Sequence, residues 1–427
     1  MVTVLALDIG SSSVRAQRFD ERAEPDGELR QERYDTTDAA EVAGLVRRIL
    51  GGAEPDATSC FAHSLVAVDR RGRALTPILG WRDTRSADAA ESLRARLDPG
   101  DVHARTGAYL HPTFWPAKLA WLAQTEPELC REAACFVSFT EYLRGGVETS
   151  LSMASATGLL DLTTGDWDAE LLTVLGLDAE RLPRIVADQP VWLDAACSNL
   201  GAGCTGGRAA LMVGTSGALR LVYETDRPRP RPGLFLYRLD KRRVVEGGAL
   251  SDGGNLYAWL ERTLVPAQGE LAGRDPSDHG LTFLPFLGGE RSTGWNPDAK
   301  GTIAGLTFAT TPLDLRQAAL EGVAFRFAAI ADLLPEAEEI VATGGGLLRD
   351  PAWVQIMADA LARPVVVSGV EEASLRGAAV AALERDGHQA APAPLGEAFG
   401  PREDRAGAYR WARERQQRLY EVLRGEQ

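Results

Sequence analysis

The chain has 427 residues, 45% hydrophobic and 25% charged, a composition that excludes a disordered chain or a disulfide-stapled scaffold. At about 150 residues per domain, this length predicts two or three domains. The net charge is −14, so the surface repels nucleic acid and anionic membranes, and neither is expected as a partner. Glycine makes up 44 of 427 residues, about 10% against a background of roughly 7%. This excess predicts tight turns or close approaches of the backbone to a ligand.

The cysteines and the first residues predict a reduced, cytoplasmic protein. The five cysteines are odd in number, and none is spaced as in a CxxC zinc or redox motif. They stand at Cys60, Cys130, Cys135, Cys197 and Cys204. The apolar run 2–7 is short and meets Asp8 at once, which favours a strand over a signal peptide. No apolar run reaches about 18 residues, so no membrane-spanning helix is expected.

Two segments with the same pattern predict a duplicated hairpin. Residues 2–8 form an aliphatic run, a Gly/Ser turn follows, and residues 14–20 alternate as a returning strand. Residues 211–223 repeat this layout, with a Gly-Thr-Ser turn in place of Gly-Ser-Ser. The two turn glycines are 204 residues apart, which favours a duplicated domain over a solenoid of repeats of about 50 residues or fewer. We therefore expect one domain over residues 1–203 and a second over 204–427.

The remaining pattern predicts a mixed α/β protein, because helical and strand periodicities alternate in the second half. Apolar spacing predicts helices over residues 38–50, 118–126, 168–176, 256–264, 313–334, 353–362, 375–385 and 407–423. Strands are predicted over residues 59–69, bent around 62–64, and over 339–343 and 365–368. The Arg-Pro run at 227–233 is expected to form an exposed loop inside the second domain. Residues 389–394 are expected to form a loop before a terminal helix that packs on the second domain.

The first turn combines a carboxylate with small hydroxyl residues, in the order Asp8, Gly10, Ser11, Ser12 and then Arg15. Turn amides and hydroxyls can hold phosphate oxygens, and a nearby carboxylate can hold Mg²⁺ through water. The Gly-Lys-Ser/Thr ending of a Walker A loop is absent. Taken by itself, this turn is better explained as an ordinary polar hairpin. The matching turn at 214–217 favours a pair of phosphate loops that grip ATP from both sides of a cleft.

Other residues admit both a functional and a structural interpretation. Gly344-Gly345-Gly346 follow a strand, and three successive glycines allow close approach to a flat ligand such as adenosine. Asp194 precedes a run of small residues and could act as a base toward a hydroxyl, although composition alone favours an N-cap aspartate. Trp81 with Asp83 could be a surface cluster, and His63 a satisfied loop histidine. No Ser-His-Asp spacing or metal-ligand cluster is present, which argues against hydrolases and metalloenzymes.

Long ordered matches in the second half resemble a known family. They cover residues 284–292, 295–297, 301–306, 344–346, 353–359 and 371–374. On these segments the chain resembles the FGGY carbohydrate kinases, and it is most similar to the gluconate kinases. The resemblance implies an actin-like (ribonuclease H-like) ATPase fold, with two duplicated domains around a cleft for nucleotide and sugar. It also implies a monomer or homodimer that uses ATP and Mg²⁺ to phosphorylate a small sugar or sugar acid.

The resemblance implies a role for each candidate residue. Asp194 matches the catalytic aspartate that deprotonates the sugar hydroxyl. The residues implied for ATP and its phosphates are Asp8, Gly10, Ser11, Ser12, Arg15, Gly214, Thr215, Ser216, Gly301, Gly344, Gly345 and Gly346. The residues implied for the substrate are His63, Ser64, Trp81, Asp83 and Glu141. Asp8 is expected to hold Mg²⁺ through water.

Gluconate is the first candidate substrate, because residues 62–65, 111–112, 141–142 and 154–159 look like gluconate-kinase patterns. The sequence departs from relatives at Phe61, Ala62, Thr140, Ser150 and Ala195, all of them on the expected sugar side. These departures bear on the choice of sugar more than on the chemistry. The alternatives are a kinase for another polyol or a ketopentose such as xylulose, and a catalytically weak sugar-binding regulator on the same fold.

Overall fold

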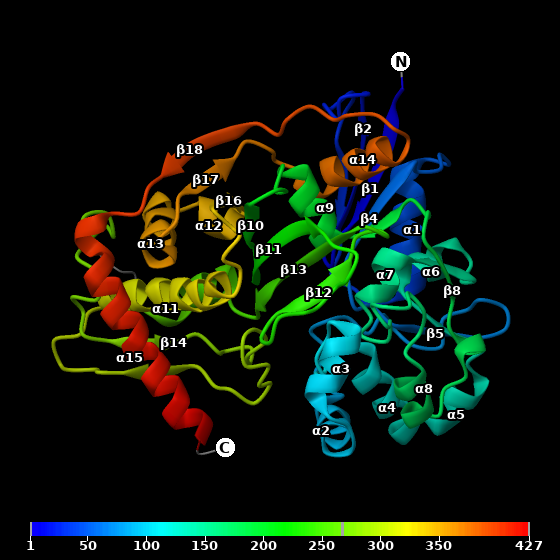
Figure 1. Cartoon of the computed structure of the whole chain (residues 1–427), viewed down its shortest axis with the longest axis horizontal. Coiled ribbons are helices and arrows are strands. Elements are labelled where there is room, and N and C mark those ends of the chain that lie inside the picture. Colours follow the sequence, from blue (N-terminus) through cyan, green and yellow to red (C-terminus); the bar gives the residue numbers. More distant parts are fainter. Residues whose placement is uncertain (1, 266–268, 426–427) are drawn as a thin grey trace.

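The first half of the chain is built around a mixed sheet with the strand order β3-β2-β1-β4-β9 (Figure 1). The computed structural model describes residues 2–265 and 269–425. The strands of this sheet are β1 (Val4–Ile9), β2 (Ser13–Phe19), β3 (Arg30–Arg33), β4 (Ala57–Cys60) and β9 (Val191–Leu193). β1 pairs antiparallel with β2, which confirms the first predicted hairpin, and parallel with β4. The carboxyl ends of β1, β4 and β9 therefore meet at one edge of the sheet.

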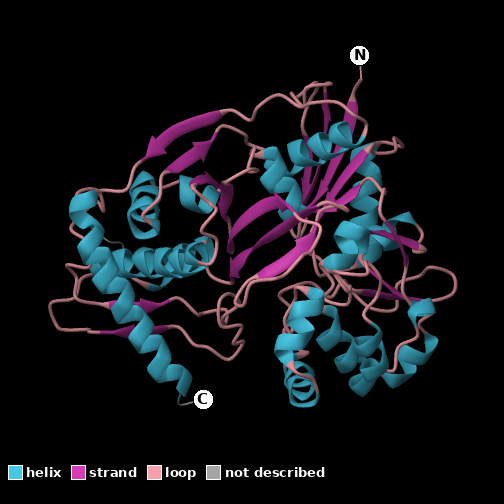
Figure 2. Ribbon diagram, viewed as in Figure 1, coloured by secondary structure: helices cyan, strands magenta, loops and turns pink. Residues whose placement is uncertain are grey.

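A second sheet carries the other hairpin, and its strands run from the upper left to the centre of Figure 2. Its order is β12-β13-β11-β10-β16-β17-β18. The strands are β10 (Arg208–Val213), β11 (Gly217–Glu224), β12 (Phe235–Arg238), β13 (Arg243–Leu250), β16 (Glu339–Thr343), β17 (Val365–Ser368) and β18 (Leu395–Phe399). β10 pairs antiparallel with β11 and parallel with β16, the same arrangement that β1 has with β2 and β4. The predicted duplication is thus present in the topology as well as in the turn sequences.

Helix α1 (Ala39–Leu50) covers the first sheet, and its ends follow from its sequence. The Asp38 carboxylate accepts a hydrogen bond from the Glu41 N–H at the amino end, and Gly51 takes a left-handed conformation at the carboxyl end. Between them, Val42, Val46 and other apolar side chains at helical spacing are buried in the core beneath β1 and β2.

A helical region follows β4 and has a hydrophobic core of its own around Trp115 and Leu119. Its helices are α2 (Ala87–Arg96), α3 (Pro99–Thr106), α4 (Trp115–Thr125), α5 (Pro127–Glu132), α6 (Phe139–Arg144), α7 (Leu151–Ser155), α8 (Ala169–Leu175) and the 3₁₀ turn η1 (Ala179–Arg181). Short strands β5 (Val66–Val68) and β6 (Cys135–Val137) pair together, as do β7 (Glu148–Ser150) and β8 (Arg184–Val186). The predicted strand over 59–69 is therefore wrong. Positive φ at His63 breaks it into β4 and β5, which belong to different sheets.

Helix α14 (Ala373–Arg385) comes from the second half of the sequence but packs on α9 (Asp194–Gly201) and the first sheet (Figure 1). Two glycines allow this contact. A Cβ on Gly201 would lie 1.8 Å from the Ala373 carbonyl oxygen, and one on Gly377 would lie 1.7 Å from that of Cys197. Leu375 and Leu383 join the core of the first domain. The two halves are thus packed together on both sides of α9, and the division at 203/204 stays a prediction.

The second sheet is covered by α11 (Pro312–Asp332) and α13 (Pro351–Leu361), with α15 (Ala406–Gly425) packed outside them. The remaining elements are α10 (Gly254–Thr263), α12 (Gly345–Leu348), β14 (Thr282–Leu284), β15 (Thr302–Ala304) and η2 (Glu403–Arg405). The predicted helices agree with these bounds to within a few residues, and the terminal helix packs on the second domain as expected. Strand β18, after the predicted loop 389–394, was missed because its side chains are mostly exposed and show no alternation of burial.

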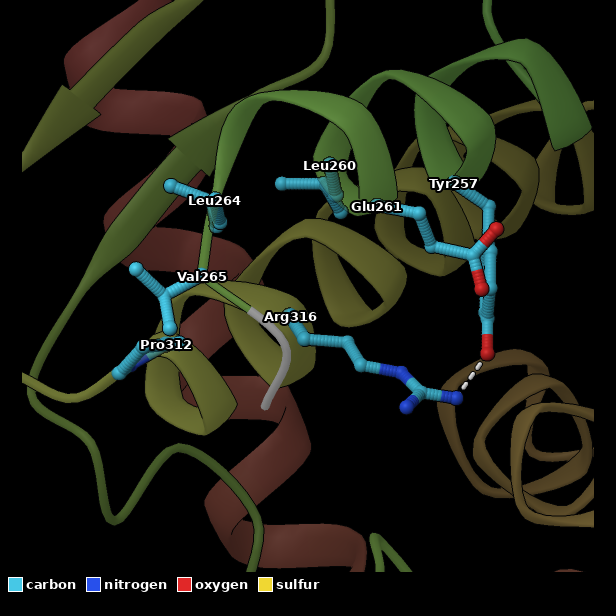
Figure 3. Close-up of a pocket in the computed structure, with 7 residues that line it drawn as sticks. All are labelled: Tyr257, Leu260, Glu261, Leu264, Val265, Pro312 and Arg316. Atoms are coloured by element: carbon cyan, nitrogen blue, oxygen red, sulfur yellow. Dashed lines mark hydrogen bonds between the residues drawn. The ribbon is translucent and has the colours of Figure 1, made fainter. Parts of the chain in front are cut away.

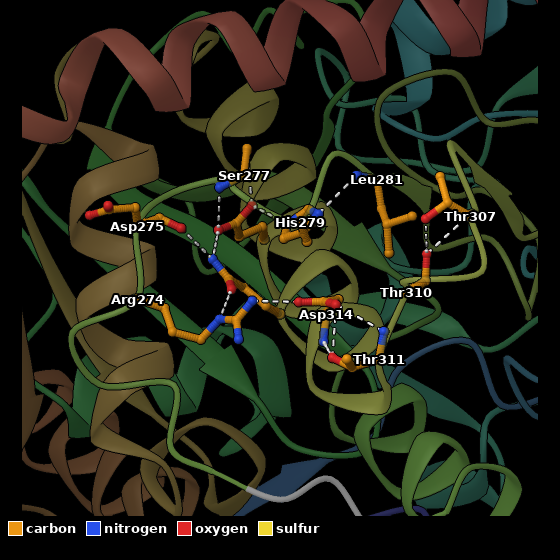
Figure 4. Close-up of polar contacts among 11 residues, drawn as sticks. Arg274, Asp275, Ser277, His279, Leu281, Thr307, Thr310, Thr311 and Asp314 are labelled. Carbon is orange, nitrogen blue, oxygen red and sulfur yellow. Dashed lines mark hydrogen bonds and ion pairs between the residues drawn. The ribbon is translucent and has the colours of Figure 1, made fainter.

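A buried polar network fastens the loop before β14 to helix α11 (Figure 4). Glu321 accepts hydrogen bonds from the Ser277 hydroxyl at 3.1 Å and from Gln317 at 2.8 Å, and it contacts His279 at 3.1 Å. Arg274 forms an ion pair with Asp314, a first-turn residue of α11. The loop is thus held by side-chain contacts where it has little regular structure. In the described part of the chain, no helix is both long and apolar enough to cross a bilayer.

Candidate active site

A cavity lies between the two hairpins, at the carboxyl edge of the first sheet. Ser11 of the first turn and Ser216 of the second line it, together with the start of α9. The predicted site residues that it brings together are Ser11, His63, Trp81, Asp194 and Ser216. Three of the departures from relatives also line this cavity, namely Phe61, Ala62 and Ala195.

Asp194 is the first residue of α9, directly after the buried strand β9. Its carboxylate accepts hydrogen bonds from the backbone N–H groups of Ala62 and Ala195. The N-cap position belongs to Leu193, so capping does not explain this aspartate. Burial raises the pKa of Asp194 to about 6, with the Arg220 cation acting in the opposite direction and Asp8 adding to the increase. A carboxylate with this pKa is ionised at neutral pH and basic enough to accept a proton.

His63 presents one ring nitrogen to the cavity because the other is occupied. Its Nδ1 lies 2.6 Å from the Ala156 carbonyl oxygen, so Nδ1 carries the proton and Nε2 is left as an acceptor. Burial lowers the pKa of His63 well below its usual value, and the ring is therefore neutral. Lys118 fixes the backbone at His63. Its ammonium donates hydrogen bonds to the carbonyl oxygens of His63 at 2.7 Å and Leu79 at 3.2 Å. Burial lowers the pKa of Lys118 to about 7.

Trp81 and Asp83 lie at the mouth of the cavity, where a neighbouring hollow begins. The hollow shares Ser11, Phe61 and Trp81 with the cavity and adds Asp83 and Arg85. Asp83 is held by Arg85, whose Nε donates to its carboxylate at 2.9 Å, and this pairing lowers the pKa of Asp83. Trp81 stacks against Arg291, with 5.5 Å between the guanidinium carbon and the ring centre.

Ser64 and Glu141 lie in the core of the first domain and do not line the cavity. The Ser64 hydroxyl accepts a hydrogen bond from the Phe139 N–H at 3.1 Å. Glu141 accepts one from the Ser138 N–H at 2.8 Å and others from the hydroxyls of Thr140 and Thr149, at 2.9 and 3.1 Å. These contacts form the cap of α6, so a direct role of either residue toward a sugar stays a prediction. Ser150 similarly caps α7, a task that serine and aspartate perform equally well.

The first hairpin places Asp8 behind the cavity. Asp8 is buried, accepts a hydrogen bond from the Ser59 hydroxyl at 2.7 Å, and pairs with Arg15 at 3.2 Å. Arg15 also contacts Glu372 at 3.4 Å, which joins the hairpin to α14. Gly10 closes the turn by donating its N–H to the Ser13 carbonyl oxygen at 2.9 Å. Ser11 and Ser12 are exposed at the tip, so their hydroxyls are free to meet a ligand.

The second hairpin is packed against two other glycine segments. Gly254 of α10 donates its N–H to the Gly214 carbonyl oxygen at 2.8 Å, and Thr215 is exposed at the tip. A Cβ on Gly344 would lie 2.5 Å from the Val213 carbonyl oxygen, and one on Gly346 would lie 2.6 Å from that of Gly214. Those two glycines are therefore explained by packing against the hairpin.

Gly345 and Gly301 stand apart from this packing. Gly345 is exposed and has nothing within 4 Å of the place of a Cβ, so it leaves open space beside the second hairpin. Gly301 is exposed before β15, and a Cβ there would lie 2.5 Å from the Leu287 side chain and 3.6 Å from the Leu287 backbone nitrogen. Gly345 thus leaves room for a ligand next to the backbone, whereas the Leu287 side chain occupies that space at Gly301.

A separate pocket lies between α10 and the start of α11 (Figure 3). Leu260, Leu264 and Pro312 provide apolar walls. Arg316 donates to the Tyr257 hydroxyl and pairs with Asp350 at 3.0 Å, which neutralises its charge. None of the residues predicted from the sequence lines this pocket.

Several residues of the cavity were not predicted as site residues. Arg220, Arg291 and Tyr237 line it. The sequence offered one weak signal for Arg220, an arginine soon after the second turn, and Arg291 lies in the segment that carries the resemblance. Asp252 is a further buried carboxylate beside the second hairpin, and burial raises its pKa to about 6.

A protein-only metal centre is not part of this site. Among residues 2–265 and 269–425, no three His, Cys, Asp or Glu side chains gather in a way that could hold a metal ion. Mg²⁺ bound to nucleotide phosphates keeps several waters and needs only one or two carboxylates. The buried Asp8 carboxylate behind the hydroxyl turn fits that requirement.

Duplicated domains with facing hydroxyl turns and a buried carboxylate between them define a phosphotransferase of the actin-like ATPase fold. Comparison of the sequence with models of known protein families gives the same class of protein. The N-terminal domain of the "FGGY family of carbohydrate kinases" matches residues 57–198, and the C-terminal domain matches residues 209–384. The chain belongs to this family, and it is a carbohydrate kinase that transfers a phosphoryl group from ATP to an alcohol group.

Individual relatives have different sugars in their names. The chain is 29% identical over 406 residues to the gluconokinase of Bacillus subtilis (strain 168), covering 82% of this chain and 79% of that one. It is 32% identical over 358 residues to a xylulose kinase of Streptomyces rubiginosus, covering 75% and 72%. A ligand-bound xylulose kinase structure from Lactobacillus acidophilus superposes with a TM-score of 0.89 at 24% identity, covering 99% and 98%. That likeness shows the fold alone.

Proposed function

We propose that the protein transfers the γ-phosphoryl group of ATP to a hydroxyl of a sugar acid, with gluconate the first candidate. The observation that carries this proposal is Asp194, a carboxylate of raised pKa at the floor of a cavity between two hydroxyl turns. The gluconokinase similarity over most of the chain supports gluconate as the first substrate to test.

In the proposed mechanism, Asp194 accepts the proton of the sugar hydroxyl as that oxygen attacks the γ-phosphorus. The new bond joins the sugar oxygen to phosphorus, and the bond from phosphorus to the β,γ-bridging oxygen breaks, which leaves ADP. The His63 Nε2 accepts a hydrogen bond from another sugar hydroxyl and orients the ring or chain. The Ala62 and Ala195 N–H groups hold the Asp194 carboxylate in place for this transfer.

The phosphates of ATP would lie between the turns. Backbone N–H groups and hydroxyls of Ser11, Ser12, Thr215 and Ser216 would donate to phosphate oxygens, and Gly345 leaves space for the rest of the nucleotide. Asp8 would hold Mg²⁺ through water, and the bound ion would neutralise charge on the phosphates. Positioning of this kind is most of the catalytic work in phosphoryl transfer.

An ADP-release screen with gluconate, xylulose, ribulose, glycerol and erythritol tests the substrate. We expect the highest kcat/KM with gluconate. Highest activity with xylulose would support the second candidate, a ketopentose kinase, which is favoured by the 32% identity to a xylulose kinase. No sugar-dependent ADP release with any compound would support a regulator that binds sugar without catalysis.

A further inference from the structure

The cavity is lined by side chains with hydrogen-bond donors that have no partner among the described residues. Arg220 Nε, Arg291 Nε and the Tyr237 hydroxyl are buried side-chain atoms without a hydrogen-bond partner among the described residues. All three side chains line the cavity that contains Asp194. Buried donors without partners cost free energy, and such groups in a folded protein call for an explanation. A ligand that accepts hydrogen bonds from these donors would explain why they lack protein partners.

Arg220 is held in place by its strand and its neighbours. It lies on β11 opposite Gly247 of β13, and it is only 5% exposed. A Cβ on Gly247 would lie 2.9 Å from the Arg220 Cγ, so this glycine leaves the room through which the side chain passes. One guanidinium nitrogen donates to the neutral Ser198 hydroxyl at 2.9 Å. Its Nε is buried without a hydrogen-bond partner, and no carboxylate of the described residues forms an ion pair with this cation.

Arg291 approaches the same cavity from the loop after β14. The carboxylate next to it in sequence, Glu290, is already occupied by Arg326 at 2.8 Å and the Tyr420 hydroxyl at 2.7 Å. Arg291 packs instead on the ring of Trp81. Its cation is thus also without a carboxylate partner within residues 2–265 and 269–425.

The charges around the cavity do not balance. The lining contains two guanidinium cations, Arg220 and Arg291, and a single carboxylate, Asp194. His63 adds no charge because its ring is neutral. A buried cation without a partner is costly, and an anion that brings its own acceptor oxygens removes that cost. A neutral polyol would satisfy some donors but leave the excess charge.

We propose that Arg220, with Arg291 and Tyr237, binds the carboxylate of an acidic sugar substrate and so determines the preference for sugar acids over neutral sugars. This inference rests on the proposed function and names its specificity residues. Arginine is suited to this task because its planar donors match a carboxylate in two parallel hydrogen bonds. The same cations could act on the transferring phosphoryl group, and the experiment separates the two roles.

The test compares gluconate with gluconamide, a neutral substrate of the same length, in the wild type, Arg220→Gln and Arg220→Lys. We expect the wild type to prefer gluconate, and Arg220→Gln to reduce the kcat/KM ratio of gluconate to gluconamide on the order of 10- to 100-fold, mainly through KM. Arg220→Lys should keep part of the preference, because it retains the charge but loses the paired geometry. Arg208→Gln is the matched control, since Arg208 lies on the adjacent strand and pairs with Glu339 away from the cavity.

Tyr237→Phe provides a second variant, which removes one hydroxyl and keeps the ring in the core. It should lower the same ratio by a smaller factor, which keeps the inference testable where Arg220→Gln fails to fold. An equal loss with both substrates in Arg220→Gln would overturn the inference, would indicate a role toward phosphate, and would leave the proposed function standing. A wild type that phosphorylates xylulose and not gluconate would overturn the proposed substrate and this inference together.

Discussion

The two hairpins have the same backbone plan but use their arginines differently. In the first, Asp8 of β1 lies directly opposite Arg15 of β2, and the two side chains form an ion pair. At the place of Asp8 the second hairpin has Met212, which lines the cavity. Its arginine, Arg220, lies opposite Ala210, two positions farther from the turn than Ala218, the residue opposite Met212. The duplicated unit therefore has one arginine with carboxylate partners and one without.

The residue across the strand pair explains this difference, because Asp8 lies opposite Arg15 whereas Ala210 lies opposite Arg220. Arg15 is held by Asp8 and Glu372, and it fixes the hairpin to α14. Arg220 lies on the same face as Met212 and Ala218, which also line the cavity. The hairpins also act in opposite directions on Asp194 between them: Asp8 raises its pKa and Arg220 lowers it. The two hairpins therefore differ in the partners of their arginines: Asp8 and Glu372 hold Arg15, while Arg220 lines the cavity without an ion pair to a carboxylate of the described residues.

The largest expected effect comes from the carboxylate that both hairpins surround. Replacing Asp194 by Asn should lower kcat on the order of 100-fold or more, because the base is lost while the shape is kept. Steady-state ADP release with the best sugar measures this change. Asp188→Asn, an exposed aspartate before β9, is the control and should keep the wild-type rate. A wild-type rate in Asp194→Asn would show that Asp194, the carboxylate between the hairpins, is not the catalytic base.

The pH profile measures the opposing effects of the hairpins directly. The pKa of Asp194 is raised to about 6, and the active form is ionised, so kcat/KM should fall about tenfold per pH unit as pH drops below 6. Arg220→Gln removes a cation that lowers this pKa, so the acid limb should move to higher pH. Asp8→Asn removes an anion that raises it, so the limb should move to lower pH. If the acid limb moved in the same direction in both variants, the two hairpins would not act on the pKa of Asp194 in opposite directions.

The glycines behind the second hairpin should separate packing from ligand binding. Gly344→Ala places a side chain at φ +90° and against the Val213 carbonyl oxygen, so it should lower the free energy of unfolding by about 1–3 kcal/mol. Gly345→Ala meets open space and should change that free energy by less than about 0.5 kcal/mol. It should instead raise the KM for ATP. Denaturant unfolding and ATP titration check the pair, and equal destabilisation of both variants would contradict this assignment.

The smallest effect is expected for the paired arginine. Arg15 is partly exposed, with 28% of its side chain accessible, so Arg15→Gln should cost about 1 kcal/mol of stability. It should lower activity toward gluconate and gluconamide by the same factor, because Arg15 does not line the cavity. Thermal melts and the two-substrate assay measure both effects. A change of the substrate ratio in Arg15→Gln without one in Arg220→Gln would reverse the roles of the hairpins.

Sequence reasoning predicted the elements whose pattern is local. The repeated turns, the strands over 339–343 and 365–368, and most helices were predicted, because apolar periodicity and turn residues act over a few positions. The bent strand over 59–69 was wrong, since a positive φ at His63 depends on the surrounding fold. Glu141 and Ser64 were selected from their place in motifs, but the structure uses their side chains in helix caps and loop contacts.

The amino-acid sequence by itself determined the two-domain plan, the hairpins, the family and the candidate base Asp194, because each is carried by a contiguous pattern. Only the tertiary structure decided which cations have partners. Arg15, Arg220 and Arg291 look alike in the sequence, yet Glu372 reaches one of them from a distance of more than half the chain, and no carboxylate of the described residues pairs with the other two. The reason is physical: an ion pair depends on distance in space, and burial makes its absence costly.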